Sequence, residues 1–247
     1  GTGMRIVAVH GNGGGSTRFR LVADLFPADI EFDAIDLPGF NGVPLDPTLD
    51  SVPAYGDHLE TLLGGRRPIV LGHGIGGSIA LDLASRRPEA IAGLILHAPV
   101  GADLDTRLFP RLMSPTWVRG LVRRGIAARP LRPIWRRIFF PGGAPADALD
   151  TFFDGYRDCA AFGQMFDIID VDWFESVAPV TDVPSVLLWG EHDRVLRSGQ
   201  TDAIAAKLPA AERVIHPGWD HFPMIEQPED YAETIAGLAR SLAAPPV

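Results

Sequence analysis

Short apolar runs alternate with helical patterns along most of this chain, and this alternation restricts the fold more than any other feature. We expect the runs to form buried strands at residues 5–10, 30–36, 68–72, 91–97, 185–190 and 213–216. Helical patterns occupy residues 51–63, 78–87, 201–208 and 229–242. Strands that alternate with helices in this way form parallel sheets. The sequence therefore predicts an α/β fold, with a mostly parallel central sheet flanked by helices.

The alternation stops between residues 101 and 178. This stretch has helical patterns and many aromatic residues but no strand-like run, and it is too apolar to be disordered. We interpret it as a helical insertion, so that residues 4–100 and 179–247 form the core and residues 101–178 a separate subdomain. A chain of 247 residues with 46% hydrophobic content is long enough for one such core.

The composition argues against several classes of protein. A net charge of −9 disfavours a general nucleic-acid binder, because a phosphate backbone attracts basic surfaces. No apolar run approaches the roughly 20 residues that cross a bilayer. The single cysteine, Cys159, excludes an intramolecular disulfide framework. No signal peptide is visible, and the Gly-Thr-Gly before Met4 looks like the remnant of a cleaved tag. We expect a cytoplasmic protein without nucleic-acid or membrane partners.

The arginines are concentrated in one part of the insertion. Residues 107–137 contain nine arginines and no acidic residue, and the stretch that follows, to Glu175, is mostly acidic. We favour an interpretation in which the two stretches face each other or solvent. The alternative is a basic rim that attracts an anionic or carrier-bound substrate, because guanidinium groups grip carboxylates well.

Two glycine-rich turns follow predicted strands at the edge where open parallel sheets bind ligands. The turn at residues 10–14 contains Asn12 among glycines, which allow the backbone to approach a substrate closely. The turn at residues 72–77 joins a strand to a helix, as a nucleophile elbow does. Its central position should carry Ser, Cys or Asp, and this chain has Gly74 there.

Two further turns contain an acid and a histidine in the chain order that this architecture requires. Asp193 follows the strand at 185–190, and His221 follows the last strand, with Glu226 and Pro228 behind it. An acid that orients a histidine raises its basicity and leaves it able to accept a proton near neutral pH. We expect Asp193 and His221 to form a catalytic pair.

These four motifs together resemble the α/β-hydrolase superfamily, in the branch of esterases, carbon–carbon hydrolases and cofactor-free lyases. The resemblance covers nearly the whole chain, with residues 101–178 similar to the cap domain of the family. It implies that the sheet begins at the strand that normally comes third. It also implies an oxyanion hole formed by the backbone N–H groups of Asn12 and Ile75.

Gly74 leaves three functions open. An enzyme of this kind can use the His221–Asp193 pair as a general base without a covalent intermediate, for elimination, cyclisation, decarboxylation, carbon–carbon cleavage or water activation. A serine hydrolase of esters, thioesters or lactones, with residue 74 substituted, is the second hypothesis. A non-catalytic small-molecule receptor is the third. In each case the ligand is small and largely apolar.

Other candidate residues carry less weight. His73 and His10 more often shape such turns than react, and His192 and Asp220 are expected to point away from the pair. Ser78 lies one helical turn beyond Gly74, on the wrong face for a nucleophile. The chain has no dinucleotide fingerprint, phosphate loop or metal motif, so we expect no cofactor and no metal.

Overall fold

A computed structural model describes residues 3–105 and 107–244. Three parts of the sequence predictions fall outside these ranges. They are the first two residues of the expected tag remnant, Thr106 of the predicted insertion and residues 245–247 of the predicted core.

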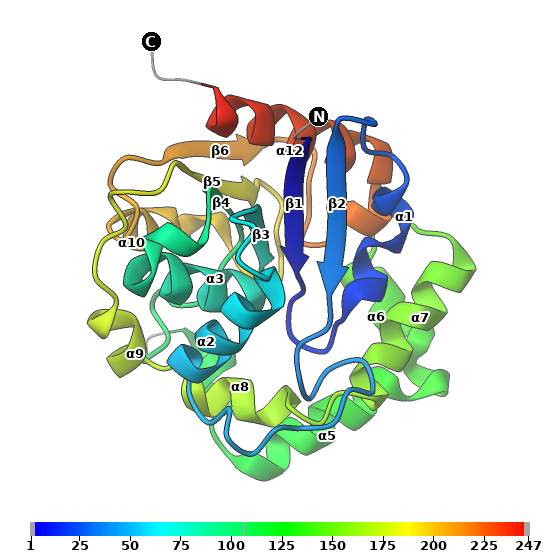
Figure 1. Cartoon of the computed structure of the whole chain (residues 1–247). Helices are drawn as coiled ribbons and strands as arrows, with labels where there is room; N and C mark the ends of the chain where they lie inside the picture. Colours follow the sequence, from blue (N-terminus) through cyan, green and yellow to red (C-terminus); the bar gives the residue numbers. More distant parts are fainter. Residues whose placement is uncertain (1–2, 106, 245–247) are drawn as a thin grey trace.

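The core is a six-stranded sheet with the order β2-β1-β3-β4-β5-β6, and every neighbouring pair is parallel (Figure 1). The strands are β1 (Met4–Val9), β2 (Ile30–Ile35), β3 (Ile69–His73), β4 (Gly93–His97), β5 (Ser185–Gly190) and β6 (Glu212–His216). Each overlaps one of the six apolar runs. The predicted fold class, with a parallel central sheet flanked by helices, is therefore confirmed.

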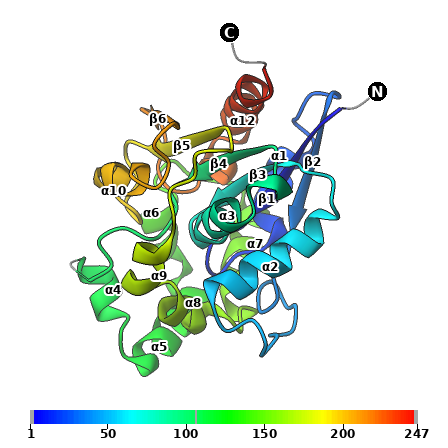
Figure 2. The same ribbon diagram turned by 60° about the vertical axis from the view of Figure 1, so that its left-hand side comes forward.

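Helices cover both faces of this sheet. The sequence expected four of them: α2 (Val52–Leu63), α3 (Ile75–Arg86), α10 (Thr201–Ala205) and α12 (Pro228–Ala243). The helix α2 begins at Ser51, whose side chain accepts a hydrogen bond from the Ala54 N–H, and ends at Gly64 with φ of 63°. The pair α2 and α3 packs together on one face, and α12 packs with α1 (Arg20–Ala23) on the other (Figure 2). The central strands β3 and β4 are buried along their whole length as a result.

The inserted segment, residues 101–178, is helical wherever it has regular structure in the described residues. It contains α4 (Leu108–Leu112), α5 (Thr116–Ala127), α6 (Arg132–Phe139), α7 (Ala146–Arg157), α8 (Phe162–Ile168) and α9 (Val171–Ser176). In Figure 1 the arrowheads of β1 and β2 point towards α5, α7 and α8. The segment thus lies beyond the carboxyl ends of the strands. Whether it is a separate subdomain stays a prediction.

Two arginines of the basic stretch form ion pairs with the acidic stretch, as the favoured interpretation expects. Arg119 contacts Asp167, and Arg132 contacts both Asp150 and Asp154. These ion pairs join α5 to α8 and α6 to α7. No helix within residues 3–105 and 107–244 is long and apolar enough to cross a membrane.

Candidate active site

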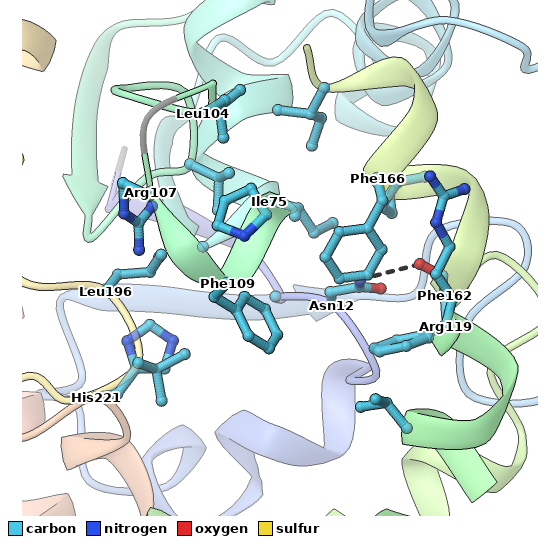
Figure 3. A pocket seen from close by; sticks show the side chains of 18 of the residues that line it. Asn12, Ile75, Leu104, Arg107, Phe109, Arg119, Phe162, Phe166, Leu196 and His221 are labelled. Atoms are coloured by element: carbon cyan, nitrogen blue, oxygen red, sulfur yellow. Dashed lines mark hydrogen bonds between the residues drawn. The ribbon is translucent and has the colours of Figure 1, made fainter. Parts of the chain in front are cut away.

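The four turns singled out in the sequence surround one cavity of about 780 Å³. Its lining includes Asn12 after β1, Gly74 and Ile75 after β3, and His221 after β6. Side chains of the inserted segment, such as Phe162 and Phe166, face His221 across the cavity (Figure 3). The lining is largely apolar, as expected. The sheet edge thus supplies His221 and the glycine-rich turns, and the inserted segment supplies most of the apolar wall together with charged side chains such as Arg107 and Arg119.

His221 and Asp193 form a buried pair. The Nδ1 atom of His221 lies 2.7 Å from the Oδ2 atom of Asp193. The Asp193 side chain is fully buried, and its other oxygen accepts hydrogen bonds from the N–H groups of Val195 (3.0 Å) and Leu196 (2.7 Å). With both oxygens occupied, the carboxylate is fixed and holds the Nδ1–H of the imidazole. The Nε2 atom of His221 is thereby left as the basic nitrogen.

Asp220 holds the backbone of the His221 loop. Its Oδ1 atom accepts hydrogen bonds from the N–H groups of His221 (2.8 Å) and Arg194 (3.2 Å), and the Arg194 guanidinium lies 3.1 Å from Oδ2. His192 is exposed. Asp220 therefore positions the loop through backbone contacts and does not contact the imidazole ring.

Gly74 has the backbone conformation of a sharp strand-to-helix turn, with φ of 57° and ψ of −124°. Its neighbours Gly72 and Gly76 are required sterically. A Cβ on Gly76 would lie 2.4 Å from the carbonyl oxygens of Val9 and His10, and one on Gly72 would lie 2.6 Å from the Gly76 oxygen. A Cβ on Gly74, by contrast, would meet only the Gly11 Cα, at 3.5 Å. The turn therefore has space for a side chain at position 74, beside Gly11, although the φ of 57° would strain any residue with a Cβ.

The backbone N–H groups of Asn12 and Ile75 make no hydrogen bond within the described part of the chain. Ile75 is the first residue of α3, where N–H groups lack helical partners and the helix dipole favours negative charge. The Asn12 side chain donates to the Phe162 carbonyl (3.1 Å; Figure 3) and accepts from the Gly13 N–H (3.0 Å). These contacts fix the turn, so the two free N–H groups can bind an anionic oxygen.

Two further buried histidines lie next to His221, with His73 in tilted ring contact with it and His97 in tilted ring contact with His73. The ring of His73 lies 4.5 Å from those of both His97 and His221, and its Nε2–H donates to the His221 carbonyl (2.9 Å). The Nδ1 atom of His97 lies 3.2 Å from the Tyr231 hydroxyl. Burial lowers the pKa of His73 and of His97 well below the ordinary value of 6.5. Both imidazoles are therefore neutral and position the loop.

The remaining candidates have structural contacts. His10 is buried, and burial lowers its pKa to about 4. Its Nδ1–H donates to the Gly11 carbonyl (2.9 Å) and its Nε2 accepts from the Leu37 N–H (3.2 Å). The Ser78 hydroxyl is buried and donates to the Val100 carbonyl. Neither side chain lines the cavity.

Sequence reasoning missed Arg18, which is buried and lines the cavity beside Asn12. An arginine in a polar stretch normally lies on the surface, so the residue type alone did not indicate a buried position in the cavity lining. Arg18 lies in the 3₁₀ helix η1 (Ser16–Phe19), shortly after the glycine-rich turn at residues 10–14. This position in the sequence could have indicated a place in the cavity lining. Arg107 also lines the cavity, and it donates to the Gln200 side chain (3.2 Å). Burial lowers the pKa of Arg107.

Within the described residues no group of three or more His, Cys, Asp or Glu side chains is arranged to hold a metal ion. Cys159 is buried and unpaired, and burial raises its pKa to about 11. The cavity lining thus includes His221, with Asp193 hydrogen-bonded to it, and Asn12 and Ile75, whose backbone N–H groups make no hydrogen bond within the described residues.

A family model, a curated protein and solved structures each match most of the chain. The model described as "Alpha/beta hydrolase family" matches residues 6–234. A pimeloyl-[acyl-carrier protein] methyl ester esterase of Aromatoleum aromaticum is 27% identical over 258 residues, which cover 95% of this chain and 98% of that protein.

Solved structures with the same fold include hydrolases of more than one kind. An esterase from Exiguobacterium antarcticum has a TM-score of 0.79 and 17% identity, over 97% of this chain and 93% of that chain. A mutant epoxide hydrolase from Bacillus megaterium has a TM-score of 0.78 and 17% identity, over 97% of this chain and 94% of that chain. At such identities the likeness is one of fold.

Proposed function

This chain belongs to the α/β-hydrolase family, and we propose that it is an enzyme in which His221, oriented by Asp193, acts as a general base without a covalent intermediate. In this proposal Gly74 occupies the position of the family nucleophile. One observation carries the proposal. An intact, buried His–Asp pair faces a cavity beside a strand-to-helix turn whose central residue has no side chain.

The proposed step is removal of a proton by the Nε2 atom of His221. The proton comes either from a carbon next to a carbonyl group or from a water molecule in the space beside Gly74. In the first case the electron pair of the broken C–H bond moves onto the carbonyl oxygen, and in the second the resulting hydroxide attacks the carbonyl carbon. Either way negative charge develops on oxygen, which the N–H groups of Asn12 and Ile75 stabilise.

General-base action supplies about 10²- to 10⁴-fold of acceleration, so substrate positioning and the N–H groups must supply the rest. The ligand proposed for the cavity is a small, largely apolar molecule, because aliphatic and aromatic side chains together dominate the wall formed by the inserted segment. An anionic or carrier-bound substrate also stays a proposal. It draws support from the acyl-carrier-protein ester named for the Aromatoleum aromaticum relative.

A second candidate function is ester hydrolysis by a serine at position 74. Two observations favour it: a Cβ fits at Gly74 with no contact closer than 3.5 Å, and relatives of the chain are named as ester hydrolases. For this chain as it stands, the missing hydroxyl prevents formation of an acyl-enzyme.

Two variants test these proposals together. With nitrobenzisoxazole as an activated carbon acid, the wild-type chain should catalyse elimination and His221→Ala should lose this activity. Gly74→Ser should hydrolyse nitrophenyl esters through an acyl-enzyme, with a burst of nitrophenol that the wild-type chain should not show. Equal elimination by the wild-type chain and His221→Ala would exclude the general base. A Gly74→Ser variant that folds but stays inactive on esters would show that position 74 is not a nucleophile position.

A further inference from the structure

The guanidinium group of Arg18 lies in a cage of aromatic rings at the edge of the cavity. Its Cζ atom is 4.6 Å from the ring centroid of Phe152, 5.2 Å from that of Phe222 and 5.6 Å from that of Tyr156. Arg18 is 4% exposed. These rings exclude water from the group, and their faces attract its positive charge.

This buried charge has no carboxylate partner among the described residues. Of the five N–H donors of the guanidinium, one on Nη2 binds the Asn12 carbonyl (3.1 Å), and the Tyr156 side chain is a second hydrogen-bond partner of the group. The Nε atom is buried without a partner. Buried arginines are normally paired, because removing the charge from water is costly. Arg18 therefore has both charge and donors available for a group that is not part of this chain.

The position of Arg18 places such a group next to the candidate reaction centre. A Cβ built on Gly11 would lie 3.2 Å from the Nη1 atom of Arg18, and Gly11 also adjoins the space above Gly74. Phe222, one wall of the cage, follows His221 directly. The guanidinium thus lies between the turn that contains Asn12 and the loop that contains the base.

We propose that Arg18 binds a carboxylate group of the substrate, attached close to the reacting carbon. A carboxylate matches the planar fork of the guanidinium, which can donate two parallel hydrogen bonds to it. In the water-poor cage this attraction is stronger than at the surface. A positive charge there would also stabilise an enolate formed next to the carboxylate. The placement of the reacting carbon, though not the carboxylate site itself, rests on the function proposed above.

Arg119 is the contrasting case in the same cavity. It is also buried, but Asp167 pairs with its charge, and three further donors bind the carbonyl oxygens of Met113, Ser114 and Gly163. Arg119 is thus satisfied within the protein, whereas Arg18 is not. Of these two buried arginines, only Arg18 has the unmet hydrogen-bonding capacity of a ligand-binding group.

Calorimetric titration of the whole chain with benzoate and with benzamide tests the proposal without turnover. The two probes have nearly the same shape and differ in charge. The wild-type chain should bind benzoate about tenfold or more tightly than benzamide, and Arg18→Met should abolish this preference. Arg18→Lys keeps the charge but loses the fork, so it should show an intermediate preference. Arg111→Met, which removes an exposed arginine at the same cavity, is the matched control and should change benzoate affinity no more than about twofold.

Equal binding of the two probes by the wild-type chain, or an unchanged benzoate preference in Arg18→Met, would overturn the proposal. If Arg18→Met does not fold, the proposal is tested by the affinities of the wild-type chain and of Arg18→Lys for benzoate and benzamide. A carboxylate preference that Arg18→Lys retains in full would show that charge alone acts and that the bidentate contact is wrong. Because no proton transfer is measured, these results do not depend on whether His221 is a general base.

Discussion

At the scale of single residues, Asp193 determines which nitrogen of His221 is basic. Replacing Asp193 with asparagine puts an amide NH₂ group against Nδ1 and favours the tautomer with hydrogen on Nε2. That nitrogen then cannot accept a proton. We expect Asp193→Asn to lower nitrobenzisoxazole turnover by about 10²-fold or more, measured as kcat across pH. Retained activity with an unchanged pH profile would contradict the proposed role of Asp193.

Gly76 permits the close approach of α3 to β1. Because a Cβ on Gly76 would lie 2.4 Å from two backbone oxygens, Gly76→Ala should lower the free energy of unfolding by about 2 kcal/mol or more, measured by urea denaturation. Gly237→Ala is the matched control. A Cβ there meets nothing within 4 Å in the middle of α12, so this variant should be more stable than the wild-type chain, by up to about 1 kcal/mol. Equal effects of the two changes would show that α3 does not need this glycine.

The sequence predicted residues whose role is visible in a local pattern, and missed those whose role depends on distant partners. Asp193, His221 and Gly74 each stand in a turn after an apolar run, so their common location at the sheet edge followed from the fold. The role proposed for Arg18 depends on contacts of its guanidinium with Phe152 and Tyr156 of α7, more than a hundred positions away in the sequence. No spacing rule links residues so far apart.

At the scale of elements, the strands were predicted closely because each is a short apolar run with a clear end. The inserted segment was predicted only as helical. Its helices are short, prolines lie between α4, α5, α6 and α7, and the helices pack through rings such as Phe139 and Phe140 rather than through a regular stripe. The short pair η1 and α1 was missed, because it directly follows three glycines that indicate a turn.

A carboxyl group links α11 (Pro223–Glu226) to the loop between α6 and α7. The Glu226 side chain accepts a hydrogen bond from the Gly142 N–H (2.8 Å), and burial raises the pKa of Glu226 from 4.5 to about 7. A raised carboxyl pKa means that the folded state holds the proton more tightly. The stability gained from this proton is therefore present below pH 4.5 and lost as pH rises through 7.

Glu226→Gln keeps a neutral acceptor at all pH values. Relative to the wild-type chain, this variant should gain stability between pH 4.5 and pH 7, by about 1 kcal/mol because the group is partly exposed. Paired urea titrations across this pH range measure the difference. A difference that does not change with pH would show that Glu226 titrates normally.

At the scale of the whole molecule, three buried histidines should make the fold sensitive to acid. Burial lowers the pKa of His10 to about 4 and those of His73 and His97 well below 6.5. A histidine whose pKa is lower in the folded state contributes stability at pH values above its unfolded pKa. This contribution is lost as the pH falls from 6.5 towards the pKa of the folded state. Glu226 acts in the opposite direction, but it is a single group against three. We expect the free energy of unfolding to fall between about pH 7 and pH 5.

The slope of the free energy of unfolding against pH tests the combined effect of the three histidines and Glu226. His97→Gln removes one buried titrating group and should flatten the slope, while His192→Asn, at an exposed position, should leave it unchanged. Stability that is constant over this range in the wild-type chain would mean that the three imidazoles are not held neutral.

The inserted segment lies between β4 and β5, and this position affects how a protein of this fold can change during evolution. These two strands are direct neighbours, with His97 opposite Leu188, so the inserted segment leaves the sheet and returns to it at adjacent points. Its length and contents can change without altering the register of any strand. The groups proposed to handle protons and charge, His221, Asp193 and the N–H groups of Asn12 and Ile75, all lie outside it. The proposed chemistry therefore belongs to the sheet edge, while the part of the cavity wall formed by the inserted segment can change independently of it.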